Sequence, residues 1–202
     1  MTHIQLGHFD QTAIEDSYDL LPLDKYTPGE FRFRRMSKVV VDGLTLLNES
    51  TFIQQPASVN NYLSDRKRVY EKIEDSVFEH PTFKHMVRTF QLVTGWRESF
   101  DIHQIRIVGK KNEWVSPTPE GPHRDGYEFV MPFVHKKVNL VGGVTRIQQS
   151  ASYNSVIMTA DLYQQFILIP DREVLHSAAS LWLFDPNKKG YWDTFVFTAN
   201  KD

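Results

Sequence analysis

Beyond about residue 101 the chain consists of short runs rich in Val, Ile, Phe and Tyr, and this pattern constrains the fold more than any other feature. Turn-forming clusters such as Ser116–Gly121 and Asp185–Gly190 separate the runs. Many short strands at regular spacing are typical of a β-sandwich or barrel. The sequence therefore predicts a mainly β core over about residues 101–199. The predicted strands cover residues 102–108, 127–134, 144–149, 155–159, 165–169, 173–176 and 192–198.

The first part of the chain predicts helices that pack on one side of this core. Residues 12–21 predict a short helix. A longer helix is expected over residues 65–79, because Val69, Ile73 and Val77 recur every four positions. Mixed charges on its outer face favour either a surface support or a contact in a homodimer.

A further helix is expected to begin at Pro81, a favoured first-turn residue, and to end near Gly95. Residues 31–41 predict an extended segment instead, because phenylalanines alternate with arginines there. We expect a single domain over residues 1–202, of the α+β type but mainly β. Its N-terminal helical support would cover about residues 12–95.

Composition narrows the chemistry that this domain can perform. An apolar share of 41% and an aromatic share of 13% indicate a real core. The absence of cysteine excludes disulfides, thiolate catalysis and cysteine-bound metals. With 23 basic against 25 acidic residues, a nucleic-acid partner is not expected. Since no membrane-length apolar run or signal pattern occurs, we expect a cytoplasmic protein with no membrane partner.

Any metal site must therefore use histidine and carboxylate ligands. On a strand, residues i and i+2 point the same way, so a His-x-Asp sequence presents both ligand types together. Two such pairs occur, His8 with Asp10 and His123 with Asp125. The first lies in a polar terminal stretch, which favours solvated side chains. The second follows a Pro/Gly turn and leads into a predicted strand, a position where barrels commonly carry sites.

Two histidines and one carboxylate form the facial triad of non-haem Fe(II) enzymes, which leaves positions open for other ligands. A third ligand must come from a distant strand, and His103, His135 and His176 are the candidates. His176 follows a Pro-Asp turn in a short extended stretch that can return opposite His123. His135 lies in a predicted loop, and His103 opens a strand as a second-choice pocket residue. Ordinary polar and core histidines remain the alternative interpretation.

Several linked segments resemble the bacterial 2-oxoglutarate/Fe(II) dioxygenases related to isoleucine dioxygenase, which hydroxylate free amino acids. The similarity spans about residues 25–199 and implies a double-stranded β-helix, a relative of the jelly roll. It also implies that His123, Asp125 and His176 bind Fe(II) and act as the catalytic centre. With 2-oxoglutarate and O2, such an enzyme oxidises a small-molecule substrate. The segments that carry the resemblance are 103–106, 117–126, 139–143, His176, 32–35, and 55–56 with Asn60 or Asn61.

One departure from this family affects the cosubstrate. The family usually has Gly-Tyr-Arg-Asp on a late strand, where the arginine pairs with 2-oxoglutarate, but here Trp192 takes the arginine's place. An indole donates one hydrogen bond and carries no charge. We expect Arg146 to bind the cosubstrate instead, with Arg106 and Lys137 as further candidates and Trp192 beside them. The alternatives are a less acidic 2-oxo acid, or an iron oxygenase that uses no 2-oxoglutarate.

The expected substrate-binding residues are Arg34, Gln104, Glu120 and His103. Gln104 and Arg106 should face the same side, because they lie two positions apart on one strand. The alternatives are a solvated face of an edge strand for Arg34 and a structural ion pair for Arg106. A non-catalytic jelly roll that binds a metabolite, with incidental histidines, is the remaining rival.

Overall fold

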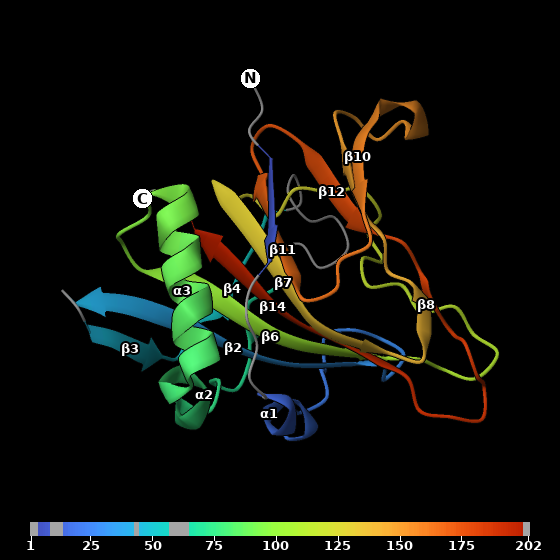
Figure 1. The fold of residues 1–202 in the computed structure, drawn as a ribbon, viewed down its shortest axis with the longest axis horizontal. Coiled ribbons are helices and arrows are strands. Elements are labelled where there is room, and N and C mark those ends of the chain that lie inside the picture. Colours follow the sequence, from blue (N-terminus) through green and yellow to red (C-terminus); the bar gives the residue numbers. More distant parts are fainter. Residues whose placement is uncertain (1–3, 9–13, 43–44, 57–64, 200–202) are drawn as a thin grey trace.

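The computed structural model describes residues 4–8, 14–42, 45–56 and 65–199 (Figure 1). Strands account for 45% of the described residues and helices for 15%, which confirms the prediction of a mainly β fold. The largest sheet is antiparallel and seven-stranded, in the order β1-β11-β7-β14-β6-β2-β3. Its strands are β1 (Gln5–His8), β2 (Arg32–Asp42), β3 (Thr45–Glu49), β6 (Phe100–Val108), β7 (Phe129–Val138), β11 (Gln165–Pro170) and β14 (Tyr191–Ala199).

Shorter strands form a second layer, grouped to one side of the large sheet in Figure 1. In this layer β9 pairs with both β10 and β12, and β8 pairs with β13. The two layers enclose a cavity, as in a jelly roll, and the predicted fold class is confirmed. The strands of this layer are β8 (Leu140–Gly142), β9 (Thr145–Gln148), β10 (Val156–Ala160), β12 (Leu175–Ala178) and β13 (Leu181–Leu183). A separate pair consists of β4 (Phe52–Ile53) and β5 (Arg68–Val69).

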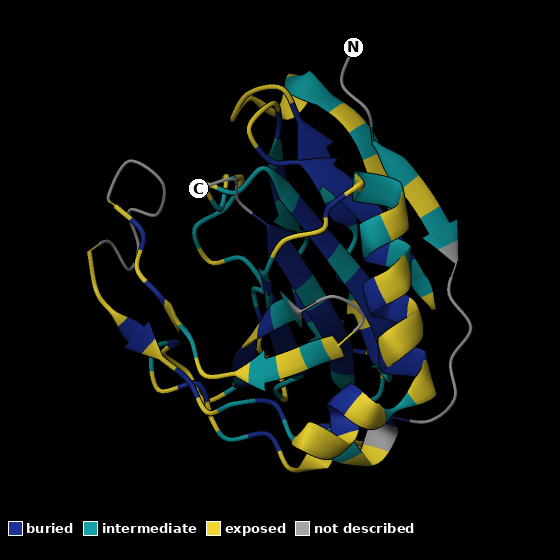
Figure 2. Ribbon diagram, turned by 90° about the vertical axis from the view of Figure 1, so that its left-hand side faces the viewer, coloured by how far each residue is buried: buried dark blue, intermediate teal, exposed yellow. Residues whose placement is uncertain are grey.

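The helices are α1 (Glu15–Asp19), α2 (Asp75–Glu79), α3 (Pro81–Thr94) and a short 3-10 turn, η1 (Tyr153–Ser155). The α3 helix begins at Pro81 and is followed by Gly95 with a φ of 72°, as its sequence predicts. Figure 2 shows α3 with its buried side toward the large sheet and its exposed side outward. Among the described residues, no helix is long and apolar enough to span a membrane.

The large sheet separates a helix-packed core from the cavity. Successive side chains of a strand point to opposite faces. On β14, Phe195 and Phe197 therefore pack against Phe83 and Phe90 of α3, while Thr194 and Val196 line the cavity. The helices thus cover one face of the large sheet, and the side chains of its other face line the cavity.

The predicted helix over residues 65–79 is wrong. Residues Arg68–Val69 form β5, and only Asp75–Glu79 is helical. The reason is tertiary: Ile73 N–H donates to Ser37 Oγ, and Met36 N–H donates to the carbonyl of residue 71. These bonds hold the segment extended along β2, and they outweigh the helical period. The basis for a helical dimer contact is lost with it.

The N-terminal part is also more than a helical support. It contributes β1, β2 and β3 to the large sheet, and β2 lies between β3 and β6 rather than at an edge. The predicted extended segment at residues 31–41 is confirmed as β2. The helix predicted at residues 12–21 is shorter than expected, since α1 covers Glu15–Asp19 and residues 12–13 lie outside the described part.

Gly142 ends β8 at a point where two backbones approach closely. Its φ is 90°, and a Cβ added there would lie 2.0 Å from the carbonyl oxygen of Ser180. We expect Gly142→Ala to lower the free energy of unfolding by about 2–3 kcal/mol, measured by urea denaturation. Gly95→Ala is the matched control, because Gly95 also has a positive φ but no atom within 4 Å of the added Cβ. Equal losses in the two variants would contradict the steric explanation.

Candidate metal centre and active site

Three ligand-type side chains converge in the lining of the cavity. His123 and Asp125 lie in the loop before β7, and His176 lies on β12. Two backbone hydrogen bonds, from His123 N–H to His176 O (3.0 Å) and in the reverse direction (2.9 Å), hold the segments side by side. One ligand atom from each of the three residues lies within 4.8 Å of the others. Two imidazoles and one carboxylate on one side match the donor set of a non-haem Fe(II) site.

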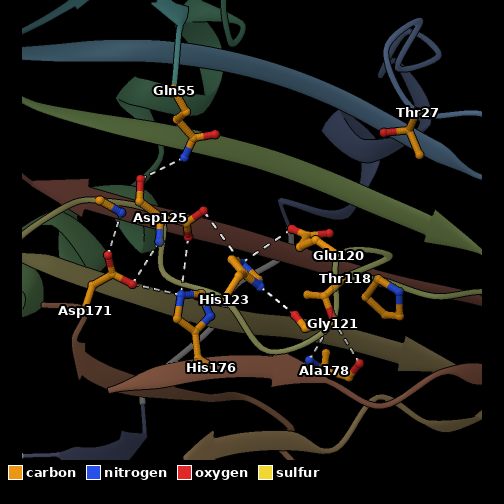
Figure 3. A network of polar contacts seen from close by, with 12 residues as sticks. Thr27, Gln55, Thr118, Glu120, Gly121, His123, Asp125, Asp171, His176 and Ala178 are labelled. Atoms are coloured by element: carbon orange, nitrogen blue, oxygen red, sulfur yellow. Dashed lines mark hydrogen bonds and ion pairs between the residues drawn. The ribbon is translucent and has the colours of Figure 1, made fainter. Parts of the chain in front are cut away.

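The orientation of His123 leaves one ring nitrogen for a metal. Its Nδ1 lies 2.8 Å from the carbonyl oxygen of Gly121, which can only accept a hydrogen bond, so Nδ1 carries the proton. Its Nε2 points toward the carboxylates of Glu120 (3.5 Å) and Asp125 (3.7 Å), as Figure 3 shows. A ligand histidine held by such an outer hydrogen bond is typical of metal sites.

Asp171 organises the ligand loop, although the sequence marks it only as part of a turn. Its fully buried carboxylate accepts hydrogen bonds from the backbone N–H groups of Asp125 (3.1 Å), Gly126 (2.8 Å) and Tyr127 (3.0 Å). Its Oδ1 also lies 3.0 Å from His176 Nε2. The available signal was an aspartate directly after the apolar strand at 165–170 and shortly before the predicted ligand His176.

The close packing of these side chains strongly shifts the pKa values of His176 and Asp125. Burial opposes protonation of His176, but hydrogen bonds to Asp125 and Asp171 raise its pKa to about 10. Burial alone would raise the pKa of Asp125, yet the His176 hydrogen bond and the nearby histidines hold it far below its usual value. Because a metal ligand must be deprotonated, metal binding at this site displaces a proton from His176.

Two arginines line the cavity beside the triad. Arg68 donates to Gln55 Oε1, and Gln55 Nε2 donates to the backbone oxygen of Asp125 at 2.8 Å. An Arg34 Nη2 atom lies 2.6 Å from His103 Nδ1. Burial and the neighbouring guanidinium of Arg34 hold the pKa of His103 well below its usual value, so His103 is neutral and accepts this hydrogen bond. The cavity, of about 180 Å³, therefore has a cationic wall next to the metal ligands.

Four of the predicted cosubstrate and substrate residues line this cavity: Arg34, His103, Glu120 and Trp192. The alternative that Arg34 lies on the solvated face of an edge strand is wrong, because β2 is internal and Arg34 is buried. Arg68 and Gln55 were not among the predicted site residues. The wrongly predicted helix at 65–79 concealed Arg68, and Gln55 was noted only as part of a resemblance. Asn60 and Asn61, and the Phe9–Asp10 part of the other His-x-Asp pair, lie outside the described residues.

Gln104 and Arg106 do share a face of β6, but it is not the cavity face. Gln104 Nε2 donates to Ser17 Oγ of α1 at 2.7 Å. Arg106 binds both carboxylate oxygens of Asp193, at 2.6 and 2.8 Å, and its guanidinium lies over the ring of Tyr191. The expected roles of Gln104 in substrate binding and of Arg106 in cosubstrate binding are therefore wrong. Arg106 has the structural ion pair named as its alternative.

Arg146 does not enter the cavity either. It lies on β9 between Thr145, which lines the cavity, and the fully buried Ile147, so its own side chain points outward over Tyr153. Lys137 is also engaged elsewhere, with the Gly142 carbonyl oxygen and the Asp161 carboxylate. The expectation that Arg146 binds the cosubstrate is wrong for this geometric reason.

Comparisons with known proteins agree with this geometry. A family model described as 2OG-Fe dioxygenase matches residues 15–198. The fold is similar to that of a bsmA homolog from Methylobium petroleophilum PM1, with 23% identity and a TM-score of 0.74 over 92% of this chain and 79% of that one. It is also similar to IDO from Bacillus thuringiensis, with 17% identity and a TM-score of 0.69 over 92% and 82%.

A third similar structure is the Fe(II)/(alpha)ketoglutarate-dependent dioxygenase TqaL, with 15% identity and a TM-score of 0.65 over 94% of this chain and 76% of that one. No curated protein matches the sequence. At these identities the three solved structures demonstrate a common fold and nothing more. The family model covers most of the chain and therefore establishes the family.

Proposed function

This chain belongs to the 2OG-Fe dioxygenase family, and we propose that it oxidises a free amino acid or a similarly small metabolite that carries a carboxylate. Its cofactors are Fe(II), 2-oxoglutarate and O2. Together they supply the oxidising power for inserting oxygen into an unactivated bond. Family membership favours this assignment over an iron oxygenase without 2-oxoglutarate and over a non-catalytic jelly roll.

The residues that would hold Fe(II) are His123, Asp125 and His176, since their donor set fits this ion. Gly121 fixes the ring of His123, and Asp171 fixes the backbone around Asp125. The chain itself thus contributes a preorganised ligand set and a cavity that shields the reacting groups from water.

The observation that carries the substrate proposal is the pair of buried arginines beside Asp125. Within the described part of the chain, Arg34 and Arg68 form no ion pair with a carboxylate, and their guanidinium groups hydrogen-bond to the neutral side chains of His103 and Gln55. The Arg34 guanidinium also lies over the ring of Tyr70, which is neutral as well. Their positive charge is thus available to an anionic ligand, and a guanidinium matches a carboxylate in shape and charge. Apolar residues of the same cavity, such as Ile105, suit an aliphatic portion of the substrate.

The resemblance to dioxygenases that act on free amino acids supports the same substrate class. The test is a screen of the twenty standard amino acids with the Fe(II)-loaded protein and 2-oxoglutarate in air. We expect amino acids with aliphatic side chains to accelerate succinate formation and to gain the mass of one oxygen atom. The absence of any amino acid that does both would contradict the substrate proposal, while the uncoupled formation of succinate would still report the family's chemistry.

Arg34→Met is expected to raise the KM for the amino acid by about 30-fold or more, because it removes the charged partner of a buried carboxylate. Arg35→Met is the matched control. Arg35 is the next residue on β2, points to the opposite face and pairs with Glu71 and Glu74. Steady-state kinetics with the best substrate of the screen measures both. An unchanged KM in Arg34→Met, or an equal increase in Arg35→Met, would remove Arg34 from substrate binding.

A further inference from the structure

One row of side chains crosses the large sheet at the part of the cavity where β2 begins. Arg32 of β2 is the cross-strand partner of Ile107 of β6, which in turn is the partner of Trp192 of β14. All three line the cavity. Neighbouring strands lie about 4.8 Å apart, so the backbones of Arg32 and Trp192 are about 10 Å from each other. A small ligand group above Ile107 can therefore contact both side chains.

Arg32 carries a positive charge in this row, and none of the described residues supplies an anion that pairs with it. Its guanidinium donates to the Pro117 carbonyl oxygen and lies 3.5 Å from Thr27 Oγ1. Its Nε is buried and has no hydrogen-bond partner in the described residues, and no carboxylate there forms an ion pair with it. Asp24 and Glu120 influence it electrostatically. Arg32 is partly buried, and a partly buried charge is costly unless a ligand or another partner neutralises it.

Trp192 adds to the same row a second donor that has no acceptor among the described residues. Its side chain is largely buried, with 8% of the residue exposed, and it lines the cavity. Among the described residues its Nε1–H group has no acceptor. A buried indole normally finds a hydrogen-bond partner. The row thus places one cation and one neutral N–H donor in the lining of the same cavity, a combination that suits a carboxylate.

We propose that Arg32 and Trp192 bind the carboxylate of 2-oxoglutarate that lies farthest from its 2-oxo acid group. Arg32 supplies the charge from β2, and Trp192 supplies a single neutral hydrogen bond from β14. Arg32, which lies two strands away in the sheet, thereby supplies the positive charge that is missing at residue 192. This inference rests on the proposed function, in that the cavity must bind 2-oxoglutarate, but it does not depend on which substrate is oxidised.

Arg32 and Arg34 occupy neighbouring positions on the same face of β2, so the carboxylate of the substrate is the competing source of an anion. The contacts separate the two arginines. Arg34 bonds to His103 and, with Arg68, forms the cationic wall beside Asp125. Arg32 bonds instead to Pro117, and the next residue, Thr118, is bonded to Ala178 on the far side of His123 from Gln55 (Figure 3). We therefore assign the two arginines to different carboxylates.

The test is isothermal titration calorimetry of the Fe(II)-loaded protein without oxygen, with 2-oxoglutarate and with 2-oxobutyrate. Both ligands have the 2-oxo acid group, and only 2-oxoglutarate has the distant carboxylate. Arg32→Met is expected to weaken 2-oxoglutarate binding by about 30-fold or more and to leave 2-oxobutyrate binding unchanged. Trp192→Phe, which keeps a ring but loses the N–H group, is expected to weaken 2-oxoglutarate binding by about 5-fold. Arg35→Met should bind both ligands like the wild type.

Retained 2-oxobutyrate binding shows that the Arg32→Met site is folded and loaded with iron. Unchanged 2-oxoglutarate affinity in Arg32→Met would overturn the proposal, and so would equal losses for both ligands. A loss confined to the amino-acid substrate would overturn it by assigning Arg32 to that carboxylate. If the wild type binds 2-oxoglutarate but oxidises no amino acid, the proposed substrate class fails while the assignment of Arg32 is still decided by the two titrations.

Discussion

Asp125→Ala is expected to weaken Fe(II) binding by more than about 100-fold, which exceeds the usual effect of losing an outer hydrogen bond to a metal ligand. Asp125 supplies the only carboxylate in the three-residue ligand group found among the described residues. Its loss removes a ligand atom and the negative charge that balances the cation. Equilibrium titration with Fe(II) in the absence of oxygen measures the affinity directly, and turnover should fall with it.

Glu120→Gln is the informative comparison, because the Glu120 carboxylate lies 3.5 Å from His123 Nε2 but outside the triad. This variant should bind Fe(II) with nearly the affinity of the wild type. The reverse outcome, in which Glu120→Gln loses iron and Asp125→Ala keeps it, would place the carboxylate ligand at residue 120 and contradict the assigned triad.

Asp171→Ala is expected to have the second largest effect, on both folding and metal binding. It leaves the backbone N–H groups of residues 125–127 without their acceptor and removes the buried carboxylate beside His176. Breaking a buried charged network of this kind costs about 3–5 kcal/mol of unfolding free energy. Because the same bonds position Asp125 and His176, Fe(II) affinity should fall by about 10–100-fold.

Urea denaturation of the metal-free protein and Fe(II) titration separate the two effects. Asp185→Ala is a suitable control, since Asp185 accepts a hydrogen bond from the backbone N–H of Asn187 in a turn remote from the triad. It should cost about 1 kcal/mol or less and leave iron binding intact. Wild-type iron affinity in a folded Asp171→Ala protein would show that the ligand loop holds its geometry without this carboxylate.

The sequence predicts the elements of this fold where local pattern and tertiary environment agree. The short apolar runs become strands because each one packs in a sheet, and α3 forms where Pro81 and Gly95 mark its two ends. The helix expected at residues 65–79 fails because Ser37 and Ile73 bond to each other across the chain. A periodic sequence cannot reveal such a partner.

The residues of the site divide in the same way, into those that local sequence predicts and those that only tertiary contacts reveal. His123 and Asp125 are recognisable because a strand period and a preceding turn are local properties of the sequence. Asp171 is missed because its function arises from three backbone groups that lie more than forty residues earlier. Trp192 is identified as a departure from a family pattern, yet the pattern does not say which cation compensates for it.

By itself, the sequence determined a mainly β chain with a His-x-Asp pair at the mouth of a strand, and it showed that Gln104 and Arg106 share one face of β6. It did not determine which face meets the cavity, because each side of that strand carries both polar and apolar residues. Packing against α1 and Asp193 places Arg106 on the face of the sheet away from the cavity. The register of β2, β6 and β14 places Arg32 on the face that lines the cavity. Strand phase is a local property, whereas the choice of face depends on which layers pack on each side of the sheet.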